Sequence, residues 1–316
     1  MPLISVNAEG SEVVPVEPGA PLAERIANAL ASAAPDMPVV LMIHGFRFAP
    51  EFPFSNPHTH ILALEPSQNC WKAISWPRHL GFGRSADEGL AIGFGWRANG
   101  TIWAAYREAA RAGVALAGLI GQIQDIVPGR RVDVVAHSLG ARVLLSALPL
   151  LAAGSVGRVI LMAGAEFQSL AEAAIRTPAG ATAEFLNITT RENDLFDLAL
   201  EALVAALRPG DRALGQGLAA PAPHWLDVQV DQAETLEALM RLGHRIAPPH
   251  RRVCHWSAYL RPGLFALYRA LLTGPQSLPL NQLRAHLPPV SEPRWSRLFA
   301  PAPVAMALPL AGKVSS

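Results

Sequence analysis

The chain has 316 residues, with 26 basic and 25 acidic side chains, a net charge of +1 and a hydrophobic content of 51%. This charge balance gives no reason to expect a nucleic acid or an acidic partner, and the apolar content is sufficient for a large core. Two cysteines, Cys70 and Cys254, are too few for a disulfide framework and favour a reducing compartment. The first residues lack the pattern of a signal peptide, and no apolar run approaches the ~20 residues of a membrane span, so we expect a cytoplasmic protein.

Apolar runs alternate with segments of helical periodicity along most of the chain. Strands are expected at residues 38–43, 90–96, 131–135, 156–163 and 184–190, with one or two edge strands within residues 3–15. Helices are expected at residues 21–34, 101–126, 141–148, 167–176, 195–207, 233–242 and 261–272. Because strands alternate with helices, the sequence predicts an α/β protein whose mainly parallel sheet has helices on both faces.

The composition favours one domain over residues 1–274, followed by a tail. Residues 46–88 are irregular and rich in proline, glycine and aromatic side chains, which is typical of a lid or a binding loop. We interpret this segment as an apolar wall that could hold an acyl group. Residues 275–316 are rich in proline and show no helical or strand period, so a weakly ordered tail is predicted there.

Ser138 stands on a sharp turn between a predicted strand and a predicted helix. At such a turn the hydroxyl is raised above the edge of the sheet, and the N–H groups that begin the helix lie beside it. Strand and helix nearly touch there, so the positions two before and two after the serine need small residues. Gly140 fits the second position, whereas Ala136 occupies the first, where the usual pattern has glycine. The pattern predicts a nucleophilic serine.

Three more segments follow predicted apolar runs in the same manner. The strand at residues 38–43 leads into His44, Gly45 and Phe46, and the strand at residues 184–190 leads into a polar segment that contains Asp194. A short apolar stub at residues 252–254 leads into His255. An acid and a histidine therefore follow the serine in chain order.

With these pieces the chain resembles the alpha/beta-hydrolases, and residues 136–143 are especially similar to bacterial serine hydrolases of the esterase and lipase type. The resemblance covers roughly residues 38–272. It implies the alpha/beta-hydrolase fold with Ser138 as nucleophile, Asp194 as acid and His255 as base, placed mainly by the chain order of the triad. It also implies an oxyanion hole made of the backbone N–H groups of Phe46 and Leu139.

Other side chains remain alternatives for two of these roles. Glu166, Glu192 and Asp197 compete with Asp194, which could instead cap the helix expected to begin at Leu195. Alternatives to His255 in the same half of the chain are His224, His244 and His250.

These features together predict a serine hydrolase that cleaves a carboxylic ester or thioester through an acyl-enzyme, with no cofactor. A small-molecule substrate is the expected partner, without nucleic acid and without a transmembrane segment. His58 and His60 have no further ligand at metal-binding spacing, so no metal is expected there. An amidase or acyltransferase with the same triad, and a non-catalytic binding protein on the same fold, are the alternatives. Acyl-chain length and oligomeric state are left open.

Overall fold

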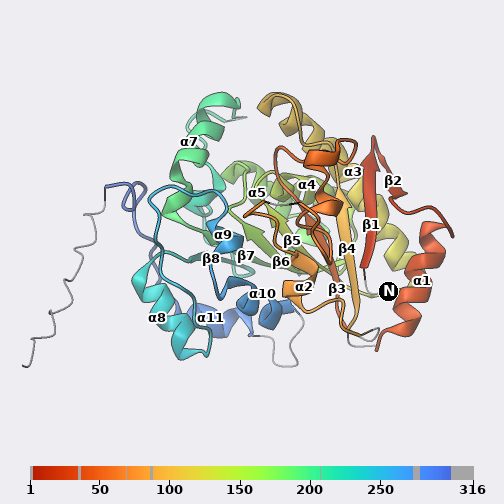
Figure 1. The fold of residues 1–316 in the computed structure, drawn as a ribbon. Coiled ribbons are helices and arrows are strands. Elements are labelled where there is room, and N and C mark those ends of the chain that lie inside the picture. The colour runs from red at the N-terminus through yellow and green to blue at the C-terminus, as the bar shows by residue number, and fades with distance from the viewer. Residues whose placement is uncertain are drawn as a thin grey trace, which may run out of the picture.

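A sheet of eight strands forms the centre of the protein in a computed structural model, which describes residues 3–34, 37–68, 70–85, 88–206, 208–272 and 278–299 (Figure 1). The strand order is β2-β1-β4-β3-β5-β6-β7-β8. All neighbouring strands run parallel except the pair β1 and β2. The predicted α/β class with a mainly parallel sheet is therefore confirmed.

The strands are β1 (Leu3–Glu9), β2 (Glu12–Pro15), β3 (Val39–Ile43), β4 (Leu90–Gly95), β5 (Val132–His137), β6 (Val156–Met162), β7 (Glu184–Thr189) and β8 (Trp225–Gln229). The α-helices are α1 (Leu22–Ser32), α2 (Trp76–Leu80), α3 (Ile102–Ile126), α4 (Gly140–Ala147), α5 (Gln168–Ile175), α6 (Pro178–Thr182), α7 (Asp194–Leu203), α8 (Ala233–Arg241), α9 (Ser257–Leu260), α10 (Leu264–Leu272) and α11 (Leu280–His286). Among these helices, none is both long and apolar enough to cross a membrane. Strand β8 and the helices α2, α6, α9 and α11 were not predicted, and β1 lies inside the sheet instead of at its edge.

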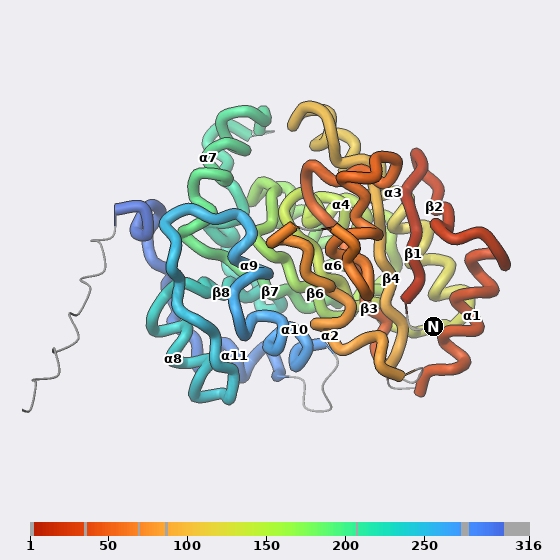
Figure 2. Tube along the Cα trace, viewed as in Figure 1, coloured from red at the N-terminus to blue at the C-terminus, as the bar shows by residue number. Residues whose placement is uncertain are grey.

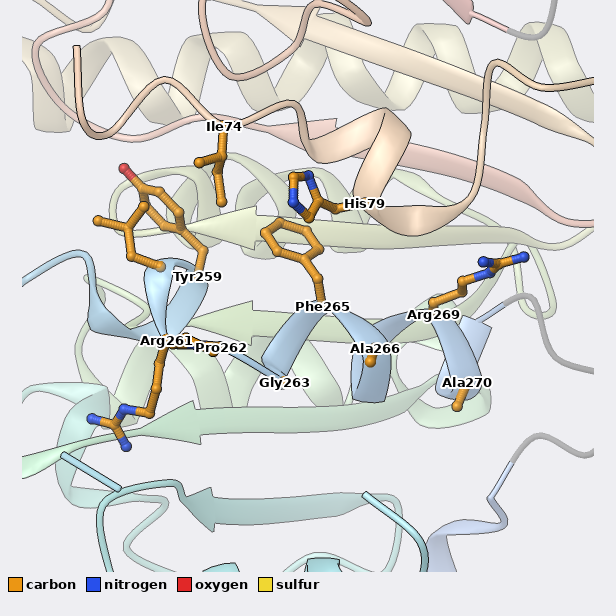
Figure 3. A pocket seen from close by; sticks show the side chains of 11 residues that line it. Ile74, His79, Tyr259, Arg261, Pro262, Gly263, Phe265, Ala266, Arg269 and Ala270 are labelled. Atoms are coloured by element: carbon orange, nitrogen blue, oxygen red, sulfur yellow. The ribbon is translucent and has the colours of Figure 1, made fainter. Parts of the chain in front are cut away.

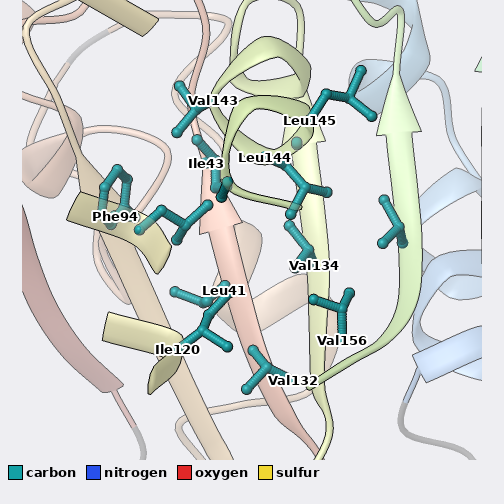
Figure 4. Close-up of a cluster of buried hydrophobic side chains, with 14 of the residues drawn as sticks. Leu41, Ile43, Phe94, Ile120, Val132, Val134, Val143, Leu144, Leu145 and Val156 are labelled. Atoms are coloured by element: carbon teal, nitrogen blue, oxygen red, sulfur yellow. The ribbon is translucent and has the colours of Figure 1, made fainter. Parts of the chain in front are cut away.

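Apolar side chains on both faces of the sheet explain why its central strands are continuous apolar runs. In β3, Leu41 and Ile43 pack into one cluster with α3 and α4 (Figure 4). Val40 and Met42 pack into a second cluster with α2 and α10. Side chains alternate between the faces of a strand, so a strand that is covered on both sides must be apolar throughout.

Parallel strands place their carboxyl ends at one edge of the sheet, where binding sites of α/β proteins form. The turns after β3, β5 and β7 all lie at this edge and carry the residues around Phe46, Ser138 and Asn193. Figure 2 traces the course of the chain through the sheet and its helices. Three segments that are far apart in the sequence are therefore neighbours here.

Residues 46–88 contribute more to the core than a lid or binding loop would. This segment contains η1 (Pro53–Ser55), η2 (Pro57–Thr59) and α2, and its fully buried side chains are Ile61, Leu62, Trp76, Leu80 and Phe82. They belong to the cluster that also contains α10. Most of the segment is thus a packed part of the domain.

Residues 278–299, which belong to the predicted weakly ordered tail, pack against the rest of the described chain. Helix α11 buries Leu280 and Leu283, and Leu287 is buried directly after it. Further on, the Trp295 N–H donates a hydrogen bond of 2.6 Å to Asp194 Oδ2. No period was recognised in this part of the sequence because α11 is short and the contacts beyond it come from irregular chain. Residues 273–277, with Pro275, and the apolar run at residues 304–310 lie outside the described residues.

Candidate active site

Ser138 occupies the turn between β5 and α4 in a left-handed backbone conformation, with a φ of 54°. Residues other than glycine seldom adopt this conformation, and it persists only where the surroundings hold it. Here the Ser138 N–H donates to the Met162 carbonyl at 3.1 Å, and the Ser138 carbonyl accepts from the Ala165 N–H at 2.9 Å. The strand-to-helix turn therefore has the strained form expected of a nucleophile.

Two glycines allow the turn after β3 to approach the turn after β5. A Cβ on Gly140 would lie 2.6 Å from the Ile43 carbonyl oxygen, and a Cβ on Gly45 would lie 2.6 Å from Ser138 Cβ. Neither distance is compatible with a side chain, so both positions require glycine. The methyl group of Ala136, by contrast, is accommodated within the core.

The backbone N–H groups of Phe46 and Leu139 lie in the two turns on either side of this approach. Both residues line the same cavity as Ser138. Neither N–H has a hydrogen-bond partner in the described part of the chain. Two N–H donors without partners therefore belong to turns that line the same cavity as the Ser138 hydroxyl.

His44 holds the turn that carries Phe46. Its Nδ1–H donates to the Gly45 carbonyl at 2.9 Å, and its Nε2 accepts from the Trp96 N–H at 3.0 Å. Burial lowers the pKa of His44 to about 3, so the ring stays neutral, as one donor and one acceptor require.

His255 lies between Ser138 and Asn193. Its Nε2 is 2.9 Å from Ser138 Oγ, and its Nδ1 is 2.7 Å from Asn193 Oδ1. Removal from water, with smaller contributions from His137 and Lys72, lowers the pKa of His255 well below 6.5. A neutral ring whose Nδ1–H donates to Asn193 leaves Nε2 free to accept the hydroxyl proton of Ser138.

The segment before His255 is held by Glu192 and is not the strand-like stub expected from the sequence. The Glu192 carbonyl accepts from the Cys254 N–H at 2.8 Å, and its buried carboxylate pairs with Arg261 at 2.6 Å. Glu192 lies in η4 (Arg191–Asn193), directly before Asn193. One short turn therefore positions both neighbours, His255 and Asn193.

Asp194, the predicted acid of the triad, has no hydrogen bond to His255 in this structure. Its Oδ1 accepts from Arg191 Nη1 at 3.2 Å and its Oδ2 from the Trp295 N–H at 2.6 Å. Both ring nitrogens of His255 are already used by Ser138 and Asn193. Successive residues of a helical turn point in directions about 100° apart, which separates the two neighbouring side chains. Nor does Asp194 precede α7 as a cap, since the helix begins at Asp194 itself.

Asn193 connects His255 to a buried carboxylate. Asn193 Nδ2 donates to Asp197 Oδ1 at 2.9 Å, four residues further along the chain. Burial, with a smaller contribution from Asp194, raises the pKa of Asp197 to about 7. Asp197 Oδ2 has no hydrogen-bond partner among the described residues, and a Cβ on Gly215 would lie 2.0 Å from it.

These contacts form one row of hydrogen bonds, from Ser138 through His255 and Asn193 to Asp197. Sequence reasoning considered Asp197 only as a direct partner of the histidine and did not consider Asn193. The sequence signal that could have indicated the contact between Asn193 and Asp197 is their spacing of four residues, because residues four apart lie next to each other on a helix.

The remaining candidates have other roles. Glu166 is buried and pairs with Arg142 at 2.5 Å, and it also accepts hydrogen bonds from the Tyr106 hydroxyl and the Phe167 N–H. It therefore fastens α4 to α3 instead of reaching His255. The alternative base His224 donates to the Ile175 carbonyl, away from Ser138.

A cavity of about 280 Å³ adjoins Ser138 and His255. Its larger apolar lining residues include Phe46, Phe48, Ile102, Phe196, Leu200, Leu203 and Trp256. Among the described residues of the range 46–88, only the first three line it, and α7 supplies much of the apolar wall that was expected from that segment.

A larger hollow of about 780 Å³ lies beside α2 and α10 (Figure 3). Its lining includes His79 and Arg269, but no serine or cysteine. The His79 Nδ1–H donates to the Ser75 carbonyl at 2.6 Å, so this nitrogen is not paired with a nucleophile.

In the described chain no three His, Cys, Asp or Glu side chains are grouped as a metal site would need.

The chain matches no model of a known protein family, and no curated protein is significantly similar to it. Its chemistry therefore has to be inferred from the geometry of Ser138 and its neighbours.

Proposed function

We propose that this protein is a serine hydrolase that cleaves a carboxylic ester or thioester through an acyl-enzyme. The observation that carries the proposal is the 2.9 Å contact between Ser138 Oγ and His255 Nε2, at a serine with a φ of 54°. A free hydroxyl is a weak nucleophile near neutral pH and needs an adjacent base. The lowered pKa of His255 keeps that base unprotonated.

In the first half of the reaction, Ser138 Oγ attacks the carbonyl carbon while its proton passes to His255 Nε2. The carbonyl oxygen becomes an oxyanion, which the N–H groups of Phe46 and Leu139 stabilise by about 3 kcal/mol each. His255 then returns the proton to the leaving alcohol or thiol as its bond to carbon breaks. The acyl group remains on Ser138 as an ester.

Water completes the cycle by the same route. His255 takes a proton from the water molecule, the resulting hydroxide adds to the acyl carbon, and the same N–H groups hold the second oxyanion. The bond to Ser138 Oγ then breaks, the proton returns from His255 to the serine, and the carboxylic acid leaves. Every proton and bond in these two steps is accounted for without a metal ion or a redox reaction.

Asn193 and Asp197 support the charged form of His255 in this scheme. Asn193 Oδ1 accepts from Nδ1–H at 2.7 Å and fixes the tautomer. The carboxylate of Asp197 lies behind the amide and favours the imidazolium that forms in each transition state. The arrangement replaces the direct acid of the usual triad by an amide with a carboxylate behind it.

Two further features favour an ester with an apolar acyl group on an alpha/beta-hydrolase fold. The cavity beside Ser138 is lined mainly by apolar side chains from α7 and from the turn after β3. The serine follows β5, a central strand of a mainly parallel sheet, as in the nucleophile turn of that fold. We therefore include the chain in this superfamily as part of the proposal.

The test is labelling by a fluorophosphonate probe, followed by a panel of p-nitrophenyl esters and acyl thioesters of graded chain length. Ser138→Ala should abolish labelling and hydrolysis with little change in melting temperature, and Ser32→Ala on α1 should behave like the parent. Absence of labelling in the parent protein would instead indicate a binding protein, and full labelling of Ser138→Ala would move the nucleophile elsewhere.

A further inference from the structure

The mouth of the cavity beside Ser138 carries an exposed guanidinium. Arg47 follows Phe46, lines the cavity and has a φ of 77°, a conformation that is unfavourable for arginine. Its N–H donates to the Ala98 carbonyl at 2.7 Å, which holds the backbone in place. The described residues provide no carboxylate partner for its side chain, which lies 5.9 Å from the centre of the Phe46 ring.

A second cation lies beside the same cavity. Lys72 Nζ is 3.4 Å from the centre of the Trp256 ring, and Trp256 lines the same cavity. Partial burial lowers the pKa of Lys72, while the smaller effects of neighbouring groups act in both directions, with Cys70 raising it and Arg47 lowering it. Arg251 lies over the adjacent ring of Trp71 at 5.0 Å.

Carboxylates near this edge of the sheet are engaged elsewhere. Glu192 pairs with Arg261, Asp194 with Arg191, and Glu201 with Arg294. Asp197 is buried behind Asn193. None of these four acids pairs with Arg47 or Lys72, so both cations are available to attract an anionic ligand group at the mouth.

We propose that the substrate is an ester or thioester whose leaving group carries a carboxylate or a phosphate. This inference rests on the proposed function. The acyl group occupies the apolar cavity, because an unpaired charge there would be strongly disfavoured. The anionic end of the leaving alcohol or thiol lies at the mouth between Arg47 and Lys72. The two cations thus select among esters with the same acyl chain.

The experiment compares two esters on the full-length protein. One is p-nitrophenyl octanoate, and the other is the same ester with a carboxylate on its nitrophenyl ring. We expect a higher kcat/KM for the anionic ester, expressed mainly in a lower KM, and a smaller preference at about 0.5 M salt because ions screen exposed charges. Competition by p-nitrophenyl phosphate and by p-nitrobenzoate then distinguishes phosphate from carboxylate.

Arg47→Gln and Lys72→Gln should each lower the ratio of kcat/KM for the anionic ester over the neutral ester by about fivefold, the usual size for a partly exposed charge pair. The exposed Arg241→Gln on α8 is the matched control and should leave the ratio unchanged. Comparing ratios between variants cancels the different reactivity of the two leaving groups.

Equal kcat/KM for the two esters in the parent protein, or a preference that survives in the Arg47→Gln Lys72→Gln double variant, would overturn this inference while the proposed hydrolase stands. If neither ester is cleaved and Ser138 is not labelled, the proposed function fails and this inference fails with it.

Discussion

Asn193 Nδ2 donates a hydrogen bond of 2.9 Å to Asp197 Oδ1, and this contact orients the amide that faces His255. A side-chain amide can present either its oxygen or its nitrogen, whereas an ionised carboxylate only accepts. With the nitrogen held by Asp197, the oxygen of Asn193 must face His255 Nδ1. Asp197 therefore determines the tautomer of a ring that it does not touch.

Replacing Asn193 should affect catalysis more than replacing Asp194. Asn193→Ala removes the acceptor for His255 Nδ1–H and should lower kcat/KM by between about 10² and 10⁴. Asp194→Asn weakens a buried pair with Arg191 and a bond from Trp295, so it should lower the melting temperature instead. Steady-state kinetics and thermal unfolding of both variants separate the two effects.

The double variant Asn193→Asp with Asp197→Asn provides the control for this prediction. It exchanges the two groups, so that a carboxylate accepts directly from His255 while an amide supports it. Its activity should exceed that of Asn193→Ala. If Asp194→Asn were inactive and Asn193→Ala active, the assignment from the structure would be incorrect.

The raised pKa of Asp197 predicts a change of activity near neutral pH. Below about pH 7 the carboxylate is protonated and no longer favours the imidazolium, so kcat/KM should fall as the pH drops through this value. His255 has a pKa well below 6.5, so its own titration lies at lower pH. In Asp197→Asn the step near pH 7 should vanish and overall activity should decrease. An unchanged profile would remove Asp197 from the mechanism.

The free energy of unfolding gives an independent check of the raised pKa of Asp197, and it should change with pH in the direction opposite to that of the activity. A carboxyl whose pKa is raised on folding stabilises the folded state below its unfolded pKa of 3.8, and this contribution is lost as the pH rises through about 7. The free energy of unfolding of the parent, relative to that of Asp197→Asn, should therefore decrease between about pH 4 and pH 7. Urea unfolding at several pH values measures this difference.

Gly45→Ala should impair the oxyanion site. The added Cβ would lie 2.6 Å from Ser138 Cβ and 2.9 Å from the His137 carbonyl oxygen, which forces the two turns apart. Displacing one oxyanion donor lowers kcat by about 10²–10³. Gly118→Ala on α3 is the control, since its Cβ would meet no atom within 4 Å and should stabilise the helix by about 1 kcal/mol. Equal activity of the two variants would contradict the arrangement.

A chain that ends at residue 274 should be unstable and poorly active. It lacks α11, and burial of Leu280, Leu283 and Leu287 contributes roughly 1.5–3 kcal/mol for each side chain. It also lacks the Trp295 N–H that bonds to Asp194. A chain that ends at residue 299 is the matched comparison and should melt at a higher temperature. Equal melting temperatures and activities would support the boundary predicted from the sequence.

Most of the fold and part of the site follow from local patterns in the sequence. Continuous apolar runs predict β3 to β7 because a strand covered on both faces tolerates few polar residues. Ser138 is recognisable because the turn requires small neighbours such as Gly140, and His255 is found because the chain order places a histidine late. Each of these inferences depends on neighbouring residues or on their order.

Only the tertiary structure decided which polar side chain meets His255 and what the end of the chain does. Asn193 and Asp194 are adjacent in the sequence, but about 100° of rotation along the turn sends one toward the ring and the other toward Arg191 and Trp295. A carboxylate was expected because it is the usual partner, and no local pattern encodes that rotation. Helix α11 likewise has few apolar residues and is held by a surface that other parts of the chain provide. Periodicity records which side of an element is buried, whereas the identity of its partner depends on segments that are distant in the sequence.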